Sequence, residues 1–122
     1  MVPVDVPGRF WPFADAFVAG ATVVIDRPKG SGHPRFPQIT YPLDYGYLEG
    51  TQAIDGGGVD IWRGSLSGGR VTGVIASMDL MKRDGELKLL IACTAEEMEV
   101  ILAFHNQADF VAGALIERPA GV

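Results

Sequence analysis

The sequence has one cysteine, few clustered charges and no long apolar run. With Cys93 alone, no disulfide can form within the chain, so a reducing location such as the cytoplasm is expected. The net charge of −5 and the scattered basic residues are unlike a nucleic-acid-binding surface. The apolar runs are too short for a membrane span, and the first residues lack the pattern of a signal peptide. The composition therefore predicts neither nucleic acid nor membrane as a partner.

Glycine and proline, in contrast, are plentiful. Sixteen glycines and eight prolines divide the 122 residues into short segments, which is typical of a fold with many turns. No linker or repeat separates these segments, so residues 1–122 are expected to form one domain. Apolar periodicity predicts strands at 21–26, 59–63, 70–79 and 86–93, a helix at 95–106, one or two helical turns before Gly20, and a short helix or edge strand within 109–122.

The predicted helix has a defined start and end. Thr94 and Glu97 have the spacing of a capping box, which places the first turn. His105 lies in the last turn and is interpreted as a helix-end residue rather than a metal ligand. Cys93, just before the helix, is expected to be a buried structural thiol.

Strands 70–79 and 86–93 are predicted to form a hairpin, with Asp84 and Gly85 favouring a turn between them. Because side chains alternate between the two faces of a strand, Glu86 and Lys88 are expected on one face. An acid beside a lysine can bind a cation and the phosphate that bridges it. The other face is expected to hold Leu87, Leu89, Ile91 and Cys93.

The stretch DGGGVD at 55–60 is the strongest candidate for a metal site. Its two aspartates, Asp55 and Asp60, flank a glycine-rich turn that can fold the first back beside the second. Two carboxylates with water and phosphate oxygens suit Mg²⁺. Alternation in strand 59–63 places Asp60 on the same face as Trp62. The preceding residues, 41–51, are expected to be turn-rich.

A polar loop at 29–35 is a candidate phosphate-binding segment. Lys29 and Arg35 lie near glycines whose backbone N–H groups are accessible to phosphate oxygens. Taken alone, the loop is more typical of a solvated turn with two unremarkable cations.

Several of these segments resemble the soluble inorganic pyrophosphatases. Residues 41–51, YPLDYGYLEGT, are similar to the family motif Y-P-x-N-Y-G-[YF]-[IV]-x-G-T, and residues 55–60 to D-[SGDN]-D-[PE]-[LIVMF]-D. VVIDRPKGS is similar to V-x-E-I-P-K-G-S, which places Asp26 at the family glutamate. The hairpin is similar to V-x-x-M-x-D followed by x-D-x-K. The resemblance covers roughly residues 23–93, and it departs from the family at Gly57, where an acid is usual.

The resemblance implies a mainly β, α+β fold, a small antiparallel OB-like barrel of five or six strands with one or two flanking helices. It also implies hydrolysis that depends on Mg²⁺ or Mn²⁺. Asp55, Asp60 and Tyr45 match catalytic positions, and Lys29, Arg35, Tyr45 and Lys88 match or replace substrate-binding ones. The implied metal ligands are Asp55, Asp60, Asp79 and Glu86, with Asp26 at the edge.

Three functions remain open at this point. The first is hydrolysis of a phosphoanhydride, most directly inorganic pyrophosphate, with Asp44 or Glu49 substituting for the acid absent at Gly57. The second is a catalytically weakened relative that binds metal and phosphate compounds, and the third is a barrel kept only for assembly. Four aromatics among the first seventeen residues, together with the resemblance, also predict a homo-oligomer.

Overall fold

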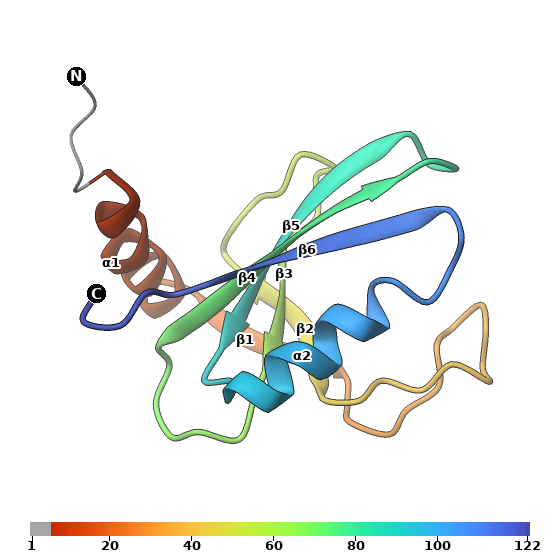
Figure 1. Cartoon of the computed structure of the whole chain (residues 1–122), viewed down its shortest axis with the longest axis horizontal. Coiled ribbons are helices and arrows are strands. Elements are labelled where there is room, and N and C mark those ends of the chain that lie inside the picture. The colour runs from red at the N-terminus through yellow and green to blue at the C-terminus, as the bar shows by residue number, and fades with distance from the viewer. Residues whose placement is uncertain (1–5) are drawn as a thin grey trace.

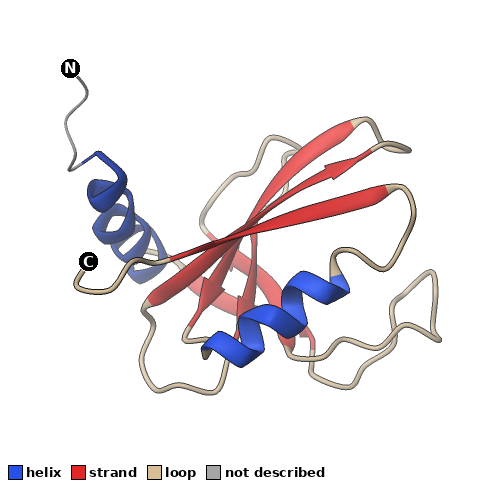
Figure 2. Ribbon diagram, in the orientation of Figure 1, coloured by secondary structure: helices blue, strands red, loops and turns tan. Residues whose placement is uncertain are grey.

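Six strands form one sheet with two helices packed against it within residues 6–122, the part of the chain that this computed structural model describes (Figure 1 and Figure 2). The strand order is β1-β2-β3-β5-β4-β6, and all neighbours are antiparallel except β3 and β5. This arrangement confirms the predicted α+β class. The elements are α1 (Val6–Ala19), β1 (Thr22–Arg27), β2 (Asp44–Glu49), β3 (Val59–Arg63), β4 (Val71–Asp79), β5 (Asp84–Ile91), α2 (Ala95–Phe104) and β6 (Val111–Glu117).

The two helices cover opposite faces of the sheet. Neighbouring residues of a strand point to opposite sides, so each face has its own side chains for a helix to pack against. On one face, Trp11 of α1 packs with Ile61 of β3 in a cluster of buried residues. On the other, Ile101 of α2 packs with Trp62 in a second cluster that also contains buried tyrosines. The second face carries the polar residues of interest.

Strand β2 corrects the turn-rich interpretation of residues 41–51. Gly46 lies in the middle of β2, opposite Ile25 of β1. A Cβ at Gly46 would lie 1.8 Å from the carbonyl oxygen of Val24, so only glycine allows the two backbones to approach this closely. The glycine therefore serves strand pairing, and Tyr45 and Tyr47 point to the face opposite Gly46.

The β4–β5 hairpin turns at 80–83, directly after residue 79 as predicted, but β5 begins two residues earlier than the predicted strand. Asp79 ends β4 and its Oδ1 accepts hydrogen bonds from the backbone N–H groups of Met81 and Lys82, at 2.9 and 2.8 Å. Arg83 adopts a φ of 60°, which completes the turn, and Asp84 already belongs to β5. Side-chain hydrogen bonds to the backbone thus outweigh the preference of the Asp-Gly pair.

The end of β5 also differs from the prediction. β5 stops at Ile91 and Ala92 has a φ of 54°, so the alternation breaks and Cys93 joins the second buried cluster rather than that of Leu89 and Ile91. Its thiol is buried as predicted, and burial raises its pKa to about 12.

The helices and the last strand complete the comparison with the predicted elements. α1 is longer than the predicted one or two turns. α2 starts at the predicted capping box, with Thr94 Oγ1 accepting from the Glu97 N–H and Glu97 Oε1 accepting from the Thr94 N–H. β6 is an edge strand paired with β4. Neither helix in residues 6–122 is long and apolar enough to cross a membrane.

Candidate active site

The buried amine of Lys88 is the centre of a group of three polar side chains that hydrogen-bond to one another. Its Nζ donates to the hydroxyl of Tyr45 at 2.8 Å and to Oδ2 of Asp60 at 3.0 Å. The Tyr45 hydroxyl itself donates to the same Oδ2 at 2.7 Å. We call Tyr45, Asp60 and Lys88 the polar triad.

Strand register brings the three residues together from separate parts of the sequence. β2 pairs with β3 so that Tyr45 lies opposite Trp62, two residues from Asp60. β3 and β5 run parallel with Ile61 beside Leu89, which places Asp60 and Lys88 next to each other on the other face. The predicted shared face of Glu86 and Lys88 is also present, since Glu86 Oε1 lies 3.6 Å from Nζ.

Charge in this group is unbalanced. The Lys88 side chain is only 8% exposed and needs anionic partners, whereas Asp60 and Glu86 are 32% and 34% exposed. Burial, reinforced by the negative charge of Asp60, raises the pKa of Tyr45, so its hydroxyl remains a donor. Two carboxylates face one ammonium, and Asp60 uses a single oxygen for both contacts within the triad. The second oxygen of Asp60 is left for a ligand.

An aromatic layer supports the triad. The ring centroids of Tyr45 and Trp62 are 4.8 Å apart, and those of Tyr41 and Tyr45 are 5.3 Å apart. Tyr41 is buried in this layer. Trp62 Nε1 donates to Nε2 of His105 at 3.0 Å, so His105 is a structural residue at the end of α2, as predicted.

Arg27 is the residue that sequence reasoning missed. Its Nη1 donates to the Tyr41 hydroxyl at 2.7 Å, and its Cζ lies 5.8 Å from the ring centroid of Tyr45. Burial alone would lower the pKa of Arg27, but the hydrogen bond to Tyr41 and nearby negative groups raise it overall. Arg27 directly follows the predicted strand 21–26, and this position is the sequence signal for it. Regular alternation along that strand does not place Arg27 at the site.

The other predicted acids lie apart from the triad. Asp55 sits in the β2–β3 loop, where Oδ1 accepts from the Gly57 N–H at 3.0 Å. Asp79 holds the turn after β4, and Asp26 is exposed on β1. Among the residues described, no three Asp, Glu, His or Cys side chains are grouped closely enough to hold a metal ion. The structure therefore brings Asp60 and Glu86 together around Lys88 but does not gather all five acids.

The loop at 28–43 carries the predicted cations Lys29 and Arg35. The backbone N–H of Lys29 donates to Asp44 Oδ1 at 2.8 Å, which ties the loop to the start of β2 and gives Asp44 a structural contact. His33 accepts the backbone N–H of Arg35 at Nδ1. Burial, together with the positive charges of Arg27, Arg35 and Lys82, lowers the pKa of His33.

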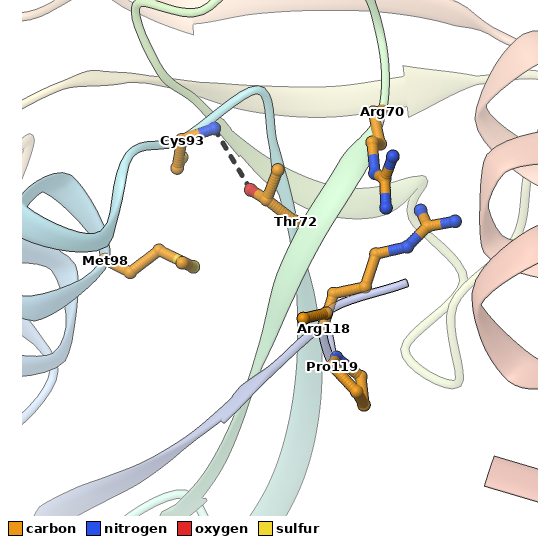
Figure 3. Close-up of a pocket in the computed structure, with 7 residues that line it drawn as sticks. Arg70, Thr72, Cys93, Met98, Arg118 and Pro119 are labelled. Atoms are coloured by element: carbon orange, nitrogen blue, oxygen red, sulfur yellow. Dashed lines mark hydrogen bonds between the residues drawn. The ribbon is translucent and has the colours of Figure 1, made fainter. Parts of the chain in front are cut away.

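A separate cavity of about 230 Å³ lies near the other end of β4 (Figure 3). Its two guanidinium groups are already engaged: Arg118 Nη1 donates to both carboxylate oxygens of Asp15 at 2.9 Å, and Arg70 Nη2 donates to the main-chain oxygen of Val122. This cavity is therefore a weaker candidate than the triad. It is lined by Arg70, Thr72, Cys93, Met98, Arg118, Pro119 and Ala120.

No protein-family model and no curated protein matches the sequence. Solved structures do match. Inorganic pyrophosphatase from Helicobacter pylori aligns over 79% of this chain and 83% of its own, with a TM-score of 0.63 and 17% identity. The fold is that of the inorganic pyrophosphatases. The enzyme from Thermus thermophilus aligns over 79% of this chain and 81% of its own, with a TM-score of 0.60 and 20% identity. Inorganic pyrophosphatase from Neisseria gonorrhoeae aligns over 80% of this chain and 83% of its own, with a TM-score of 0.63 and 17% identity.

This pyrophosphatase fold agrees with the sequence resemblance noted at 41–51 and 55–60, and it includes the predicted OB-like sheet. At 15–20% identity the likeness concerns the fold. The reaction has to be argued from the side chains.

Proposed function

We propose that the chain is a metal-dependent hydrolase of phosphoanhydrides, with inorganic pyrophosphate as its substrate. The observation that carries this proposal is the polar triad. Tyr45, Asp60 and Lys88 come from three separate motifs that each resemble pyrophosphatase motifs, and they meet within hydrogen-bonding distance on a pyrophosphatase fold. A framework kept only for assembly has no need for a buried lysine held between two acids.

Each member of the site has a separate task in this proposal. Lys88, already charged and desolvated, neutralises phosphoryl oxygens and favours the charge that develops on the leaving phosphate. Tyr45 keeps its proton and orients both Asp60 and the substrate. Asp60 and Glu86 offer exposed carboxylate oxygens, the ligand type that Mg²⁺ or Mn²⁺ prefers together with water. A bound divalent ion would polarise the phosphoryl group and acidify a water molecule.

Asp55, Asp79 and Asp26 are proposed as further ligands, and Lys29 and Arg35 as further phosphate contacts. Asp55 and Asp79 lie between members of the triad in sequence, and both lie in or beside turns. Turns adjust more readily than strands when a cation draws carboxylates together. Activity in the cytoplasm agrees with the single buried thiol.

The second candidate function is binding of metal and phosphate compounds without efficient turnover. Two observations favour it. The described residues hold no ready group of three metal-ligating side chains, and Gly57 provides no carboxylate beside Asp55. Under this alternative, substrate and Mg²⁺ bind but phosphate is released slowly.

A phosphate-release assay separates the two candidates. Pyrophosphate and nucleoside di- and triphosphates are supplied with and without Mg²⁺, and Asp60→Asn is compared with Glu99→Gln, which alters an exposed glutamate on α2. We expect Mg²⁺-dependent release from pyrophosphate that falls on the order of 100-fold or more in Asp60→Asn and is unchanged in the control. No release by the parent protein would reject hydrolysis and leave the binding function, which calorimetry with pyrophosphate then tests.

A further inference from the structure

Strand β1 contains an irregularity that changes which side chain faces the candidate site. Val24 pairs with Tyr47 and Ile25 with Gly46, but the next partner, Tyr45, pairs with Arg27. Asp26 is thus the extra residue of a β-bulge. Bulges of this kind redirect a side chain and are common beside active sites.

The bulge exchanges one charge for its opposite. With regular pairing, Asp26 would lie opposite Tyr45, whereas the observed register gives that position to Arg27. Cross-strand partners point to the same face of a sheet, so the guanidinium lies on the face that carries the triad. A cation therefore stands where simple alternation would place an acid.

Most hydrogen-bonding capacity of Arg27 is uncommitted. A guanidinium has five N–H donors, and in the described residues the side-chain contact recorded for Arg27 is the one from Nη1 to the Tyr41 hydroxyl. The ion pairs found among residues 6–122 involve Lys88 and Arg118, and none of them includes Arg27. A half-buried guanidinium without a carboxylate favours an external anion.

Arg27 and Lys88 are linked through one ring. The Cζ of Arg27 lies 5.8 Å from the ring centroid of Tyr45, and the Nζ of Lys88 lies 5.3 Å from the same centroid. Both cations thus border the Tyr45 ring, and a ligand with two anionic groups can offer one group to each. A single phosphate ion would engage one of them.

We propose that Arg27 is a substrate-binding residue that holds one phosphoryl group of a diphosphate while Lys88 holds the other. The inference rests on the proposed function for the identity of the substrate, and it makes the site selective for diphosphates over monophosphate. It also assigns to Arg27, from β1, a role that no motif in the sequence predicts.

Substitution at Arg27 tests the assignment. Arg27→Gln removes the positive charge, and Arg27→Lys keeps the charge but lacks the planar guanidinium with its paired N–H donors. Arg9→Gln is the control, since Arg9 lies on α1 over the ring of Phe13. Kinetics with pyrophosphate, calorimetry with methylenediphosphonate and with inorganic phosphate, and melting temperatures are measured for each. We expect Arg27→Gln to raise KM and to weaken diphosphonate binding about 10- to 100-fold, with kcat changed less than about threefold.

The Arg27→Lys variant and the measurement with phosphate give two further expected results. Arg27→Lys is expected to lie between the parent and Arg27→Gln, and phosphate binding is expected to change much less than diphosphonate binding. Unchanged KM and diphosphonate affinity in a folded Arg27→Gln protein would overturn the assignment, as would an equal loss in Arg9→Gln. If Arg27→Gln does not fold, parent-like KM and affinity in Arg27→Lys overturn it instead.

Failure of this inference can be told apart from failure of the proposed hydrolysis. A parent protein that releases no phosphate but binds diphosphonate through Arg27 would reject the hydrolysis and support the inference. A parent that hydrolyses pyrophosphate with a KM independent of Arg27 would do the reverse. A parent that binds no diphosphonate and releases no phosphate overturns both.

Discussion

The indole of Trp62 donates a hydrogen bond of 3.0 Å to Nε2 of His105, joining the middle of the sheet to the end of α2. The bond requires a neutral imidazole, because a protonated Nε2 cannot accept. Burial, together with the positive charge of Lys88, lowers the pKa of His105 to about 4. The aromatic layer beneath the triad is therefore sensitive to acid.

Stability is expected to fall as this histidine becomes protonated in the unfolded chain. An unfolded histidine takes up its proton near pH 6.5, whereas folded His105 resists until about pH 4. The stabilisation is complete above pH 6.5 and is lost as the pH falls to about 4, by roughly 3 kcal/mol at most. Urea unfolding at a series of pH values measures the loss.

His105→Gln provides the control for this pH dependence. Glutamine can accept from the Trp62 N–H but does not titrate, so the difference in unfolding free energy between parent and variant isolates the histidine. Parallel curves for the two proteins from pH 7 to pH 4 would show that His105 is not the group responsible.

Lys88→Met is expected to reduce both stability and activity. The substitution leaves Asp60 and the Tyr45 hydroxyl without their cation, which costs about 1–3 kcal/mol because the acids remain partly hydrated. Adding Asp60→Asn removes the unpaired charge and is expected to restore part of the stability but none of the pyrophosphate hydrolysis. Recovery of activity in the double variant would contradict the role given to Lys88.

Divalent metal is expected to stabilise the protein. A cation that binds the folded chain through Asp60 and Glu86 raises the melting temperature by mass action. Millimolar Mg²⁺ or Mn²⁺ should therefore raise it in the parent and in Glu99→Gln, which alters an exposed residue of α2. An equal rise in the Asp55→Asn/Asp60→Asn double variant would place the metal elsewhere.

The outer surface of α1 carries the observation behind the expected homo-oligomer. Phe10, Phe13 and Phe17 recur on one side of the helix and are 42%, 60% and 45% exposed, while Trp11 between them is buried in the sheet. An apolar helical stripe of this kind is typical of a surface that another protein covers. We expect light scattering to give a multiple of the 13.0 kDa chain mass.

Phe13→Glu tests whether that stripe is the interface. A buried carboxylate at the centre of the stripe should dissociate the assembly at micromolar concentration. Val100→Glu alters a similarly exposed apolar residue on α2 and should not. A monomeric parent protein would reject self-association, and dissociation by both substitutions would not support α1 as the interface.

Local patterns were sufficient for elements whose residues alternate without interruption. Strand 59–63 and the first turn of α2 lie where alternation and the capping box predicted them. The errors came from contacts between distant segments. Gly46 reads as a breaker until the backbone of Val24 is placed against it, and Arg27 reads as a loop residue until the bulge rotates it toward Tyr45.

The same limit applies to the site. Alternation alone predicted that Glu86 and Lys88 share a face and that Asp60 lies with Trp62, because each statement concerns one strand. Bringing Asp60 to Lys88 required the parallel pairing of β3 with β5, which no local signal reports. Asp55 and Asp79 lie apart from the triad, and their role as ligands stays a prediction.

The substitution Gly57→Asp is expected to raise activity. A Cβ at Gly57 would meet only Asp55 Oδ1, at the ordinary distance of 3.5 Å, and its backbone does not have the positive φ found at Gly56, so a side chain fits without strain. Gly58 differs, because a Cβ there would lie 2.7 Å from the carbonyl oxygen of Leu48. The added carboxylate stands next to the Asp55 side chain, where it can act as a general base and as a ligand.

Pyrophosphate hydrolysis at saturating Mg²⁺ measures the gain, and Gly57→Asn is the matched control of equal size without charge. We expect Gly57→Asp to be faster than the parent by tenfold or more, the usual scale of a general base, and Gly57→Asn to match the parent. Equal rates for both variants would show that backbone change rather than charge matters. A parent that already hydrolyses pyrophosphate rapidly would contradict the idea that Gly57 limits it. Glu49 would then be the acid to replace first, because the carboxylate of Asp44 already accepts the Lys29 N–H.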